Sequence, residues 1–134
     1  MAPATGTETI LIVDDDADIL SIGQKMLASS GYRVLTALSG NQALALLSDT
    51  GQRVDLLMTD FVMPDMNGVE LVGRVRTLRA ALPVLYFSAY SGHEPLRPEF
   101  ARGVPYLAKP FTLVQLRQKV REILDGQYGS AAKA

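Results

Sequence analysis

Charged and hydroxyl side chains follow several short apolar runs in this chain. Three aspartates, residues 14–16, follow the first run, while Asp60, Ser88 and Lys109 follow three others. If these runs are neighbouring parallel strands, their carboxyl ends bring three or four carboxylates, a hydroxyl and an ammonium group together. Such carboxylates repel one another, and a hard divalent cation would relieve the repulsion. Few protein oxygens and an open mouth favour magnesium over calcium, with Lys109 holding an incoming anion. A carboxylate so placed could accept a phosphoryl group and form an aspartyl phosphate.

The apolar runs have the spacing of strands that alternate with helices. They begin 21 to 28 residues apart, which leaves room for a helix and two short loops in each interval. The runs are residues 9–13, 33–37, 55–59, 83–87 and 104–108. Because they are almost continuously apolar, we expect an α/β fold with a parallel sheet covered on both faces. The second run is followed by no charged group, so its strand should lie at the edge of the sheet.

Helix boundaries are marked by residues that suit helix ends. The expected helices are residues 16–30, one that opens at Ser39, residues 67–78, and one that opens at Thr112. Ser39 with Gln42 and Thr112 with Gln115 have the spacing of a capping box. Gly31 stands where the first helix would need a left-handed residue. Between residues 91 and 103, Pro95 and Pro98 cannot both lie inside a regular helix, so the fourth helix should be short or broken.

Length and composition indicate one ordinary globular domain. The chain has 134 residues, and we expect the domain to span residues 8–125, with flexible tails at 1–7 and 126–134. The 13 basic and 14 acidic side chains argue against direct nucleic-acid binding. No apolar run is long enough to span or insert into a membrane, and the absence of cysteine suits a reducing compartment, so a cytoplasmic location is expected. A nucleotide site is disfavoured because no Gly-rich phosphate loop is present.

Four sequence motifs together resemble the receiver domain of two-component response regulators. They are ILIVDDD at 10–16, DLLMTDFVMPDMNG at 55–68, LPVLYFSAY at 82–90 and YLAKPF at 106–111. The resemblance covers about residues 8–125 and implies a flavodoxin-like (βα)5 fold with a five-stranded sheet in the order 2-1-3-4-5. The 91–103 segment is similar to receivers of hybrid sensor histidine kinases. Whether the chain is a stand-alone regulator or one domain of a longer protein is left open.

The resemblance assigns a metal role to the acidic residues. Asp60 matches the phosphoacceptor and a magnesium ligand, and Asp14 and Asp15 match the acidic pair of the family. The second acid of that pair usually binds magnesium directly, and the first acts through water or a hydrogen bond. The backbone carbonyl of Val62 matches the remaining protein ligand. The implied cofactor is Mg²⁺, with Mn²⁺ able to substitute.

The same resemblance assigns roles in phosphoryl binding and switching. Ser88 matches the hydroxyl that binds a phosphoryl oxygen, and Lys109 matches the lysine that pairs with the phosphate. Tyr106 matches the aromatic position that turns inward when the hydroxyl moves, so Ser88 and Tyr106 form the implied switch.

Several of these residues also have an ordinary structural explanation. Asp16 is expected to cap the first helix rather than bind metal. Tyr106 could be a half-buried strand aromatic with no switching role. Met63 is expected to pack under its loop, and Asp18 and Asp65 to be solvated charges.

The function implied by the resemblance is phosphoryl transfer in signalling. A histidine kinase or histidine phosphotransfer protein would donate a phosphoryl group to Asp60, and an unknown downstream protein would respond. The chain would catalyse only its own phosphorylation and dephosphorylation, as a monomer or weak dimer. One alternative is a receiver-like docking module that needs no phosphate. Another is a phosphohydrolase with Asp14 as nucleophile, although such enzymes usually carry a further acidic pair late in the chain.

Overall fold

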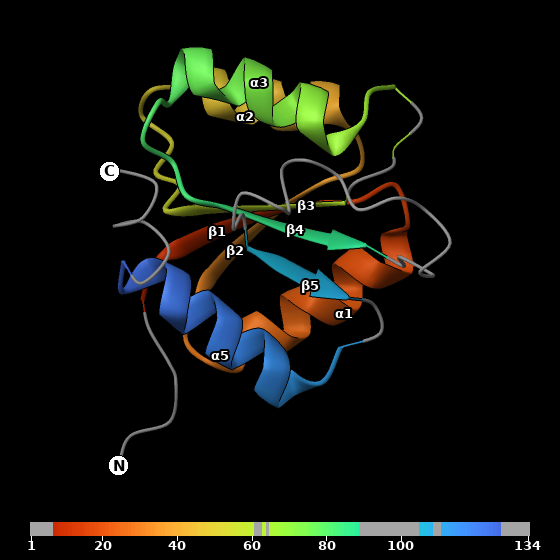
Figure 1. The fold of residues 1–134 in the computed structure, drawn as a ribbon, viewed down its shortest axis with the longest axis vertical. Helices are drawn as coiled ribbons and strands as arrows, with labels where there is room; N and C mark the ends of the chain where they lie inside the picture. Colours follow the sequence, from red (N-terminus) through yellow and green to blue (C-terminus); the bar gives the residue numbers. More distant parts are fainter. Residues whose placement is uncertain (1–6, 61–62, 64, 89–104, 109–110, 127–134) are drawn as a thin grey trace.

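Five parallel strands form one sheet in the order β2-β1-β3-β4-β5, as predicted (Figure 1). The computed structural model describes residues 7–60, 63, 65–88, 105–108 and 111–126. The strands are β1 (Thr9–Val13), β2 (Arg33–Ala37), β3 (Leu56–Asp60), β4 (Val84–Ser88) and β5 (Tyr106–Ala108). The helices are α1 (Ala17–Ala28), α2 (Gly40–Ser48), α3 (Gly68–Leu78) and α5 (Leu113–Leu124). The irregular fourth helix expected at 91–103, and most of both expected tails, lie outside the described residues.

Helices cover both faces of the sheet. Figure 1 shows α2 and α3 on one face and α1 and α5 on the other. Along β1, alternate residues enter opposite cores, because successive strand side chains point to opposite faces. Leu11 and Val13 pack with α2 and α3, whereas Ile10 and Ile12 pack with α1 and α5. Every residue of β1 and β3 is buried, which explains why these runs read as continuous apolar segments.

Two strands are shifted by one residue from the sequence prediction. β3 and β4 each begin and end one residue later than expected, so Asp60 and Ser88 are the last residues of their strands. At the start of β3, the Asp55 carboxylate accepts a hydrogen bond from the Thr9 N–H at 2.8 Å. Asp55 therefore closes the turn before the strand instead of opening the strand itself. β5 begins at Tyr106, later than the expected residue 104, and the described residue Pro105 precedes the strand.

The helix ends follow the predicted caps, with one correction. Asp16 caps α1 through the Asp18 N–H, Gly31 has a φ of 95°, and Thr112 with Gln115 forms a complete capping box. At α2, the Ser39 hydroxyl accepts from the Gln42 N–H as predicted. However, the Gln42 amide oxygen accepts from the Leu38 N–H at 2.8 Å instead of from Ser39. Among the described residues, no helix combines the length and apolar character needed to cross a bilayer.

An ion-pair network fastens α5 to the start of β1. The Arg121 guanidinium lies 2.7 Å from the Glu8 carboxylate and 2.9 Å from the Asp125 carboxylate. It also donates to the Tyr32 hydroxyl at 3.3 Å. The hydrogen bond from Arg121 lowers the pKa of Glu8, although desolvation acts in the opposite direction. Glu8 therefore stabilises the fold in its ionised form.

The Glu8 contact predicts a pH-dependent stability. A pKa that is lower in the folded state gives stability that is present above the ordinary pKa of the carboxyl group and is lost as the pH falls through the folded value. At neutral pH, Glu8→Gln should lower the free energy of unfolding by about 1 kcal/mol, because both side chains are partly exposed. The difference in unfolding free energy between the parent and Glu8→Gln should disappear as the pH falls from about 5 to about 3. Urea unfolding of both proteins across that range measures this difference. A difference that does not change with pH would contradict a stabilising role of ionised Glu8.

Two glycines in helices should respond oppositely to alanine. A Cβ at Gly40 would lie 2.6 Å from Met66 Cγ, whereas a Cβ at Gly73 would meet nothing within 4 Å. Gly40→Ala should therefore lower the free energy of unfolding by about 1 to 3 kcal/mol through overpacking. Gly73→Ala should raise it by up to about 1 kcal/mol through helix propensity. Chemical denaturation measures the free energy of unfolding of both variants. Equal values would show that the Met66 side chain can move aside without cost.

Candidate functional site

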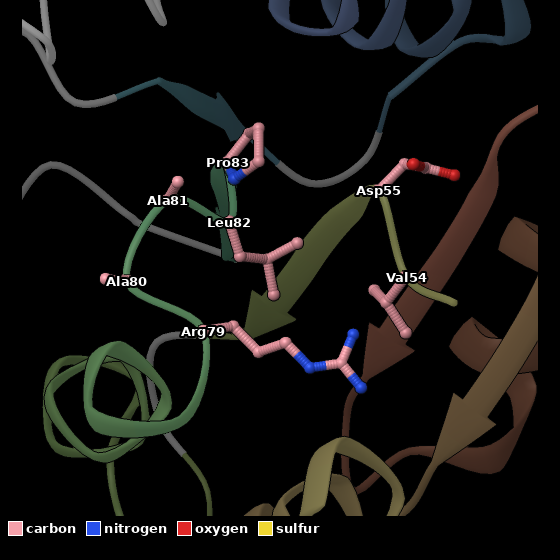
Figure 2. A pocket seen from close by; sticks show the side chains of 7 residues that line it. All are labelled: Val54, Asp55, Arg79, Ala80, Ala81, Leu82 and Pro83. Carbon is pink, nitrogen blue, oxygen red and sulfur yellow. The ribbon is translucent and has the colours of Figure 1, made fainter. Parts of the chain in front are cut away.

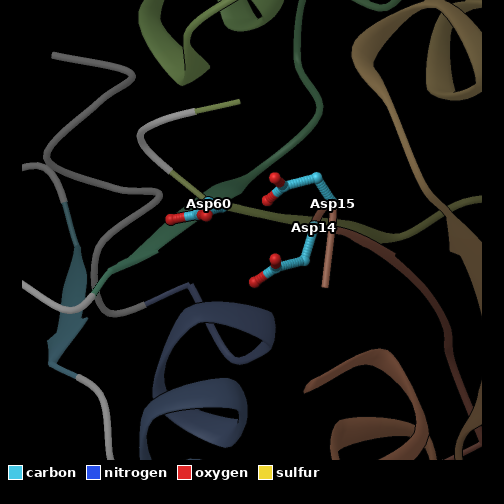
Figure 3. A group of neighbouring side chains, drawn as sticks. All are labelled: Asp14, Asp15 and Asp60. Carbon is cyan, nitrogen blue, oxygen red and sulfur yellow. The ribbon is translucent and has the colours of Figure 1, made fainter. Parts of the chain in front are cut away.

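Three carboxylates meet at the carboxyl edge of the sheet (Figure 3). Asp14 and Asp15 follow β1, Asp60 ends β3, and one oxygen from each lies within 4.8 Å of the others. The parallel pairing of Val13 with Thr59 places these strand ends side by side. The predicted convergence of the acids is therefore present in the fold.

The cluster is buried on the side of Asp14 and Asp60 and open to solvent on the side of Asp15. Asp14 is 1% exposed and Asp60 is 8% exposed, whereas Asp15 is exposed. Partly buried oxygen ligands that are open to solvent on one side fit a cation such as magnesium, which keeps several of its waters. The donor set is thus compatible with the metal that the sequence predicted, and clustered carboxylates gain most from such a charge.

Backbone hydrogen bonds fix the Asp14 side of the cluster. The Asp14 N–H donates to the Ala37 carbonyl at 3.1 Å, and its carboxylate accepts from the Asp16 N–H at 2.9 Å. The Asp16 carboxylate in turn accepts from the Asp18 N–H at 2.9 Å. Asp16 is exposed and caps α1, which confirms that its carboxylate serves the helix.

The remaining predicted residues are placed only in part. Ser88 ends β4, the strand next to β3, and its backbone is paired with Ala108 at the end of β5. Ser88 therefore belongs to the same edge of the sheet as Asp60. Lys109 and Val62 lie outside the described residues.

Tyr106 is the first residue of β5 and is half-buried. It is in register with Tyr86 and packs against the core on the α2 and α3 side. The position matches the ordinary strand aromatic considered above. Rotation of the ring is not tested by a single conformation, so its switch role stays a prediction.

Asp65 is exposed, as expected of a solvated charge, but it has a structural role that the sequence did not indicate. Although exposed, its carboxylate is not simply solvated, because it accepts from the Gly40 N–H at 3.2 Å and the Asn41 N–H at 2.9 Å. Desolvation raises the pKa of Asp65, but these backbone donors outweigh it and the pKa is lowered. The partners are 24 and 25 residues away, and no local motif marks them. Met63 is buried, as expected.

A shallow hollow at the opposite edge of the sheet offers a different kind of surface (Figure 2). It lies before β3 and β4 and is lined by Val54, Asp55, Arg79, Ala80, Ala81, Leu82 and Pro83. Its two charged groups serve the fold. Arg79 donates to the carbonyls of Leu47, Asp49 and Gln52 around the end of α2. Asp55 pairs with Arg53 at 2.8 Å and accepts from Thr9. The acidic cluster is therefore the better candidate for chemistry.

Comparisons with known proteins identify the family of this chain. The family model of the response regulator receiver domain matches residues 10–121. The chain is 34% identical over 129 residues to the sensor kinase CckA of Brucella abortus. This match covers 92% of the present chain and 13% of the sensor kinase. It spans about half or less of the curated relatives that it matches.

Solved structures show the same fold. A receiver domain from Methanospirillum hungatei is 29% identical with a TM-score of 0.78, covering 93% of this chain and 99% of that one. The response regulator TrrA of Thermotoga maritima, in complex with Mg²⁺-BeF, is 28% identical with a TM-score of 0.73, covering 87% and 99%. A family match over most of the chain, the shared fold and the acidic cluster together show that the chain belongs to the response regulator receiver domains of two-component systems.

Proposed function

We propose that this domain, spanning residues 8–125, accepts a phosphoryl group on Asp60 in a magnesium-dependent reaction and regulates a partner protein. The observation that carries the proposal is the convergence of Asp14, Asp15 and Asp60 at the carboxyl edge of the sheet. Asp60 is mostly buried and stands on the central strand β3, so its carboxylate is held firmly. A positioned carboxylate beside a cation is what phosphoryl transfer chiefly requires.

The metal would be held by the three carboxylates and the backbone carbonyl of Val62. Asp15, at the open mouth, suits direct ligation. Asp14 already accepts a hydrogen bond from the Asp16 N–H, which suits a role through water or a hydrogen bond. When bound, magnesium supplies positive charge that offsets the phosphoryl oxygens. Mn²⁺ also prefers oxygen ligands and should substitute.

The transfer exchanges one phosphorus bond for another. A carboxylate oxygen of Asp60 attacks the phosphorus atom, the bond from phosphorus to the donor histidine nitrogen breaks, and an aspartyl phosphate forms. Ser88 and Lys109 would contact the phosphoryl oxygens. Hydrolysis of the aspartyl phosphate returns the Asp60 carboxylate, so the domain acts chemically only on itself. Movement of Ser88 with inward rotation of Tyr106 would carry the signal to a second conformation.

The partners follow from this chemistry. The donor is a histidine kinase or a histidine phosphotransfer protein, and a downstream protein reads the phosphorylated state. Similarity to a sensor kinase and to response regulators supports both kinds of partner. The domain would act as a monomer or weak dimer in the cytoplasm, without contacting nucleic acid itself.

Intact-protein mass spectrometry tests the acceptor. Incubation with magnesium and acetyl phosphate should add one phosphoryl group to the parent and none to Asp60→Asn, because the amide is not a nucleophile of this kind. Asp49→Asn is the matched control, since Asp49 is an exposed aspartate at the far end of α2. A chelator should abolish the adduct in every protein.

Other outcomes of that experiment separate the alternatives. An adduct that persists in Asp60→Asn but vanishes in Asp14→Asn would favour phosphohydrolase chemistry. No adduct, even from a phosphorylated histidine protein with saturating magnesium, would favour a docking module. Partner binding that Asp60→Asn leaves unchanged would then support docking directly.

Magnesium affinity distinguishes two neighbouring aspartates. Asp15→Asn should weaken magnesium binding at least about tenfold, because it removes a charged ligand from the cluster. Asp16→Asn should bind as the parent does, since asparagine caps a helix as well as aspartate. Calorimetric titration measures both dissociation constants, and equal losses would contradict the separate roles of metal ligand and helix cap.

A further inference from the structure

We propose that Asp65 is a positioning residue for the acidic cluster, holding itself and Met66 against the start of α2. The inference rests on the proposed function, because it concerns how the magnesium site is shaped. The evidence is a pair of hydrogen bonds to the Asp65 carboxylate, a tight packing contact of Met66, and a third hydrogen bond that involves Asp14.

The Asp65 carboxylate joins two elements that are distant in sequence. Its Oδ1 accepts from the Gly40 N–H at 3.2 Å and its Oδ2 accepts from the Asn41 N–H at 2.9 Å. Both oxygens are therefore used at the first turn of α2, where N–H groups have no partner within the helix. The neighbouring residue Met66 is buried and packs so closely on Gly40 that a Cβ there would lie 2.6 Å from its Cγ. Polar and apolar contacts thus fasten the same two segments.

The residue that ends β2, shortly before α2, forms a hydrogen bond with Asp14. The carbonyl of Ala37, at the end of β2, accepts from the Asp14 N–H at 3.1 Å. Residues 37–41 therefore contact Asp14 on one side and Asp65 on the other. Asp65 comes five residues after Asp60 in the sequence, so an anchored Asp65 restrains the end of β3. The separation between Asp14 and Asp60 thus has a second support besides the pairing of β1 with β3.

This support matters because like charges tend to separate. The oxygens of Asp14, Asp15 and Asp60 lie within 4.8 Å of one another, and their repulsion favours a wider cluster. A contact that keeps the cluster narrow before metal arrives would raise magnesium affinity. Residues that orient metal ligands from outside commonly change affinity by about tenfold or more.

Calorimetric magnesium titration of the parent, Asp65→Ala, Asp65→Asn and Asp49→Ala tests the inference. Asp49 is the matched control, because its exposed carboxylate also accepts a backbone hydrogen bond, from the Gly51 N–H at 3.0 Å, at the opposite end of α2. At about 0.15 M salt, where distant surface charges are screened, Asp65→Ala should bind magnesium about tenfold more weakly. Asp49→Ala should match the parent. Asp65→Asn keeps one acceptor oxygen and should recover part of the loss.

Hydrogen exchange in the metal-free proteins supplies an independent measurement. The amides of Gly40 and Asn41 should exchange faster in Asp65→Ala than in the parent or Asp49→Ala. An unchanged dissociation constant in a folded Asp65→Ala would overturn the proposal, as would an equal loss in Asp49→Ala or no recovery in Asp65→Asn. If Asp65→Ala fails to fold, Asp65→Asn alone decides by its affinity and exchange.

Magnesium binding is measured without phosphorylation, so the two proposals can fail separately. A parent that binds magnesium but takes no phosphoryl group would contradict the phosphoacceptor function and leave the positioning role standing. A parent that binds no magnesium would overturn both.

Discussion

The direct pairing of β1 with β3 is the constraint on which the candidate site depends. It places the acids that follow β1 beside the acid that ends β3, with oxygens within 4.8 Å. Two carboxylates at that separation repel by a few kcal/mol at an effective dielectric constant of about 20. Burial of one or two aliphatic side chains contributes a similar stabilisation. Because β1 and β3 are buried along their full length, the two cores outweigh this repulsion.

The fold could be predicted because its signals are local. Continuous apolar runs mark strands buried on both faces, and short-range caps such as Asp16 and Thr112 mark helix starts. The exact starts of the strands could not be predicted in the same way. At the start of β3, the Asp55 carboxylate accepts a hydrogen bond from the Thr9 N–H, 46 residues away. An acidic residue that opens an apolar run is ambiguous until that partner is known.

In the candidate site, too, some features could be predicted from the sequence and others depend on distant partners. The convergence of Asp14, Asp15 and Asp60 follows from topology, because any parallel sheet collects the residues at its carboxyl ends. Asp65 gave no such signal, since it lies between two elements and its partners are backbone N–H groups distant in sequence. Likewise, Gln42 satisfies the predicted spacing but binds the Leu38 N–H, one residue from the expected donor. Spacing identifies which groups can bond, whereas backbone geometry decides which do.

Charged side chains are arranged differently at the two edges of the sheet. Near the amino edge, Asp55 is paired with Arg53, Arg79 binds three carbonyls, and Glu8 pairs with Arg121. These arrangements compensate each charge and stabilise the fold. At the carboxyl edge, the carboxylate oxygens of Asp14, Asp15 and Asp60 lie within 4.8 Å of one another, and Asp14 and Asp60 are mostly buried. Like charges held this close raise the free energy of the site, and a positively charged ligand would lower it. The cluster is therefore best explained by such a ligand and by the chemistry that it supports.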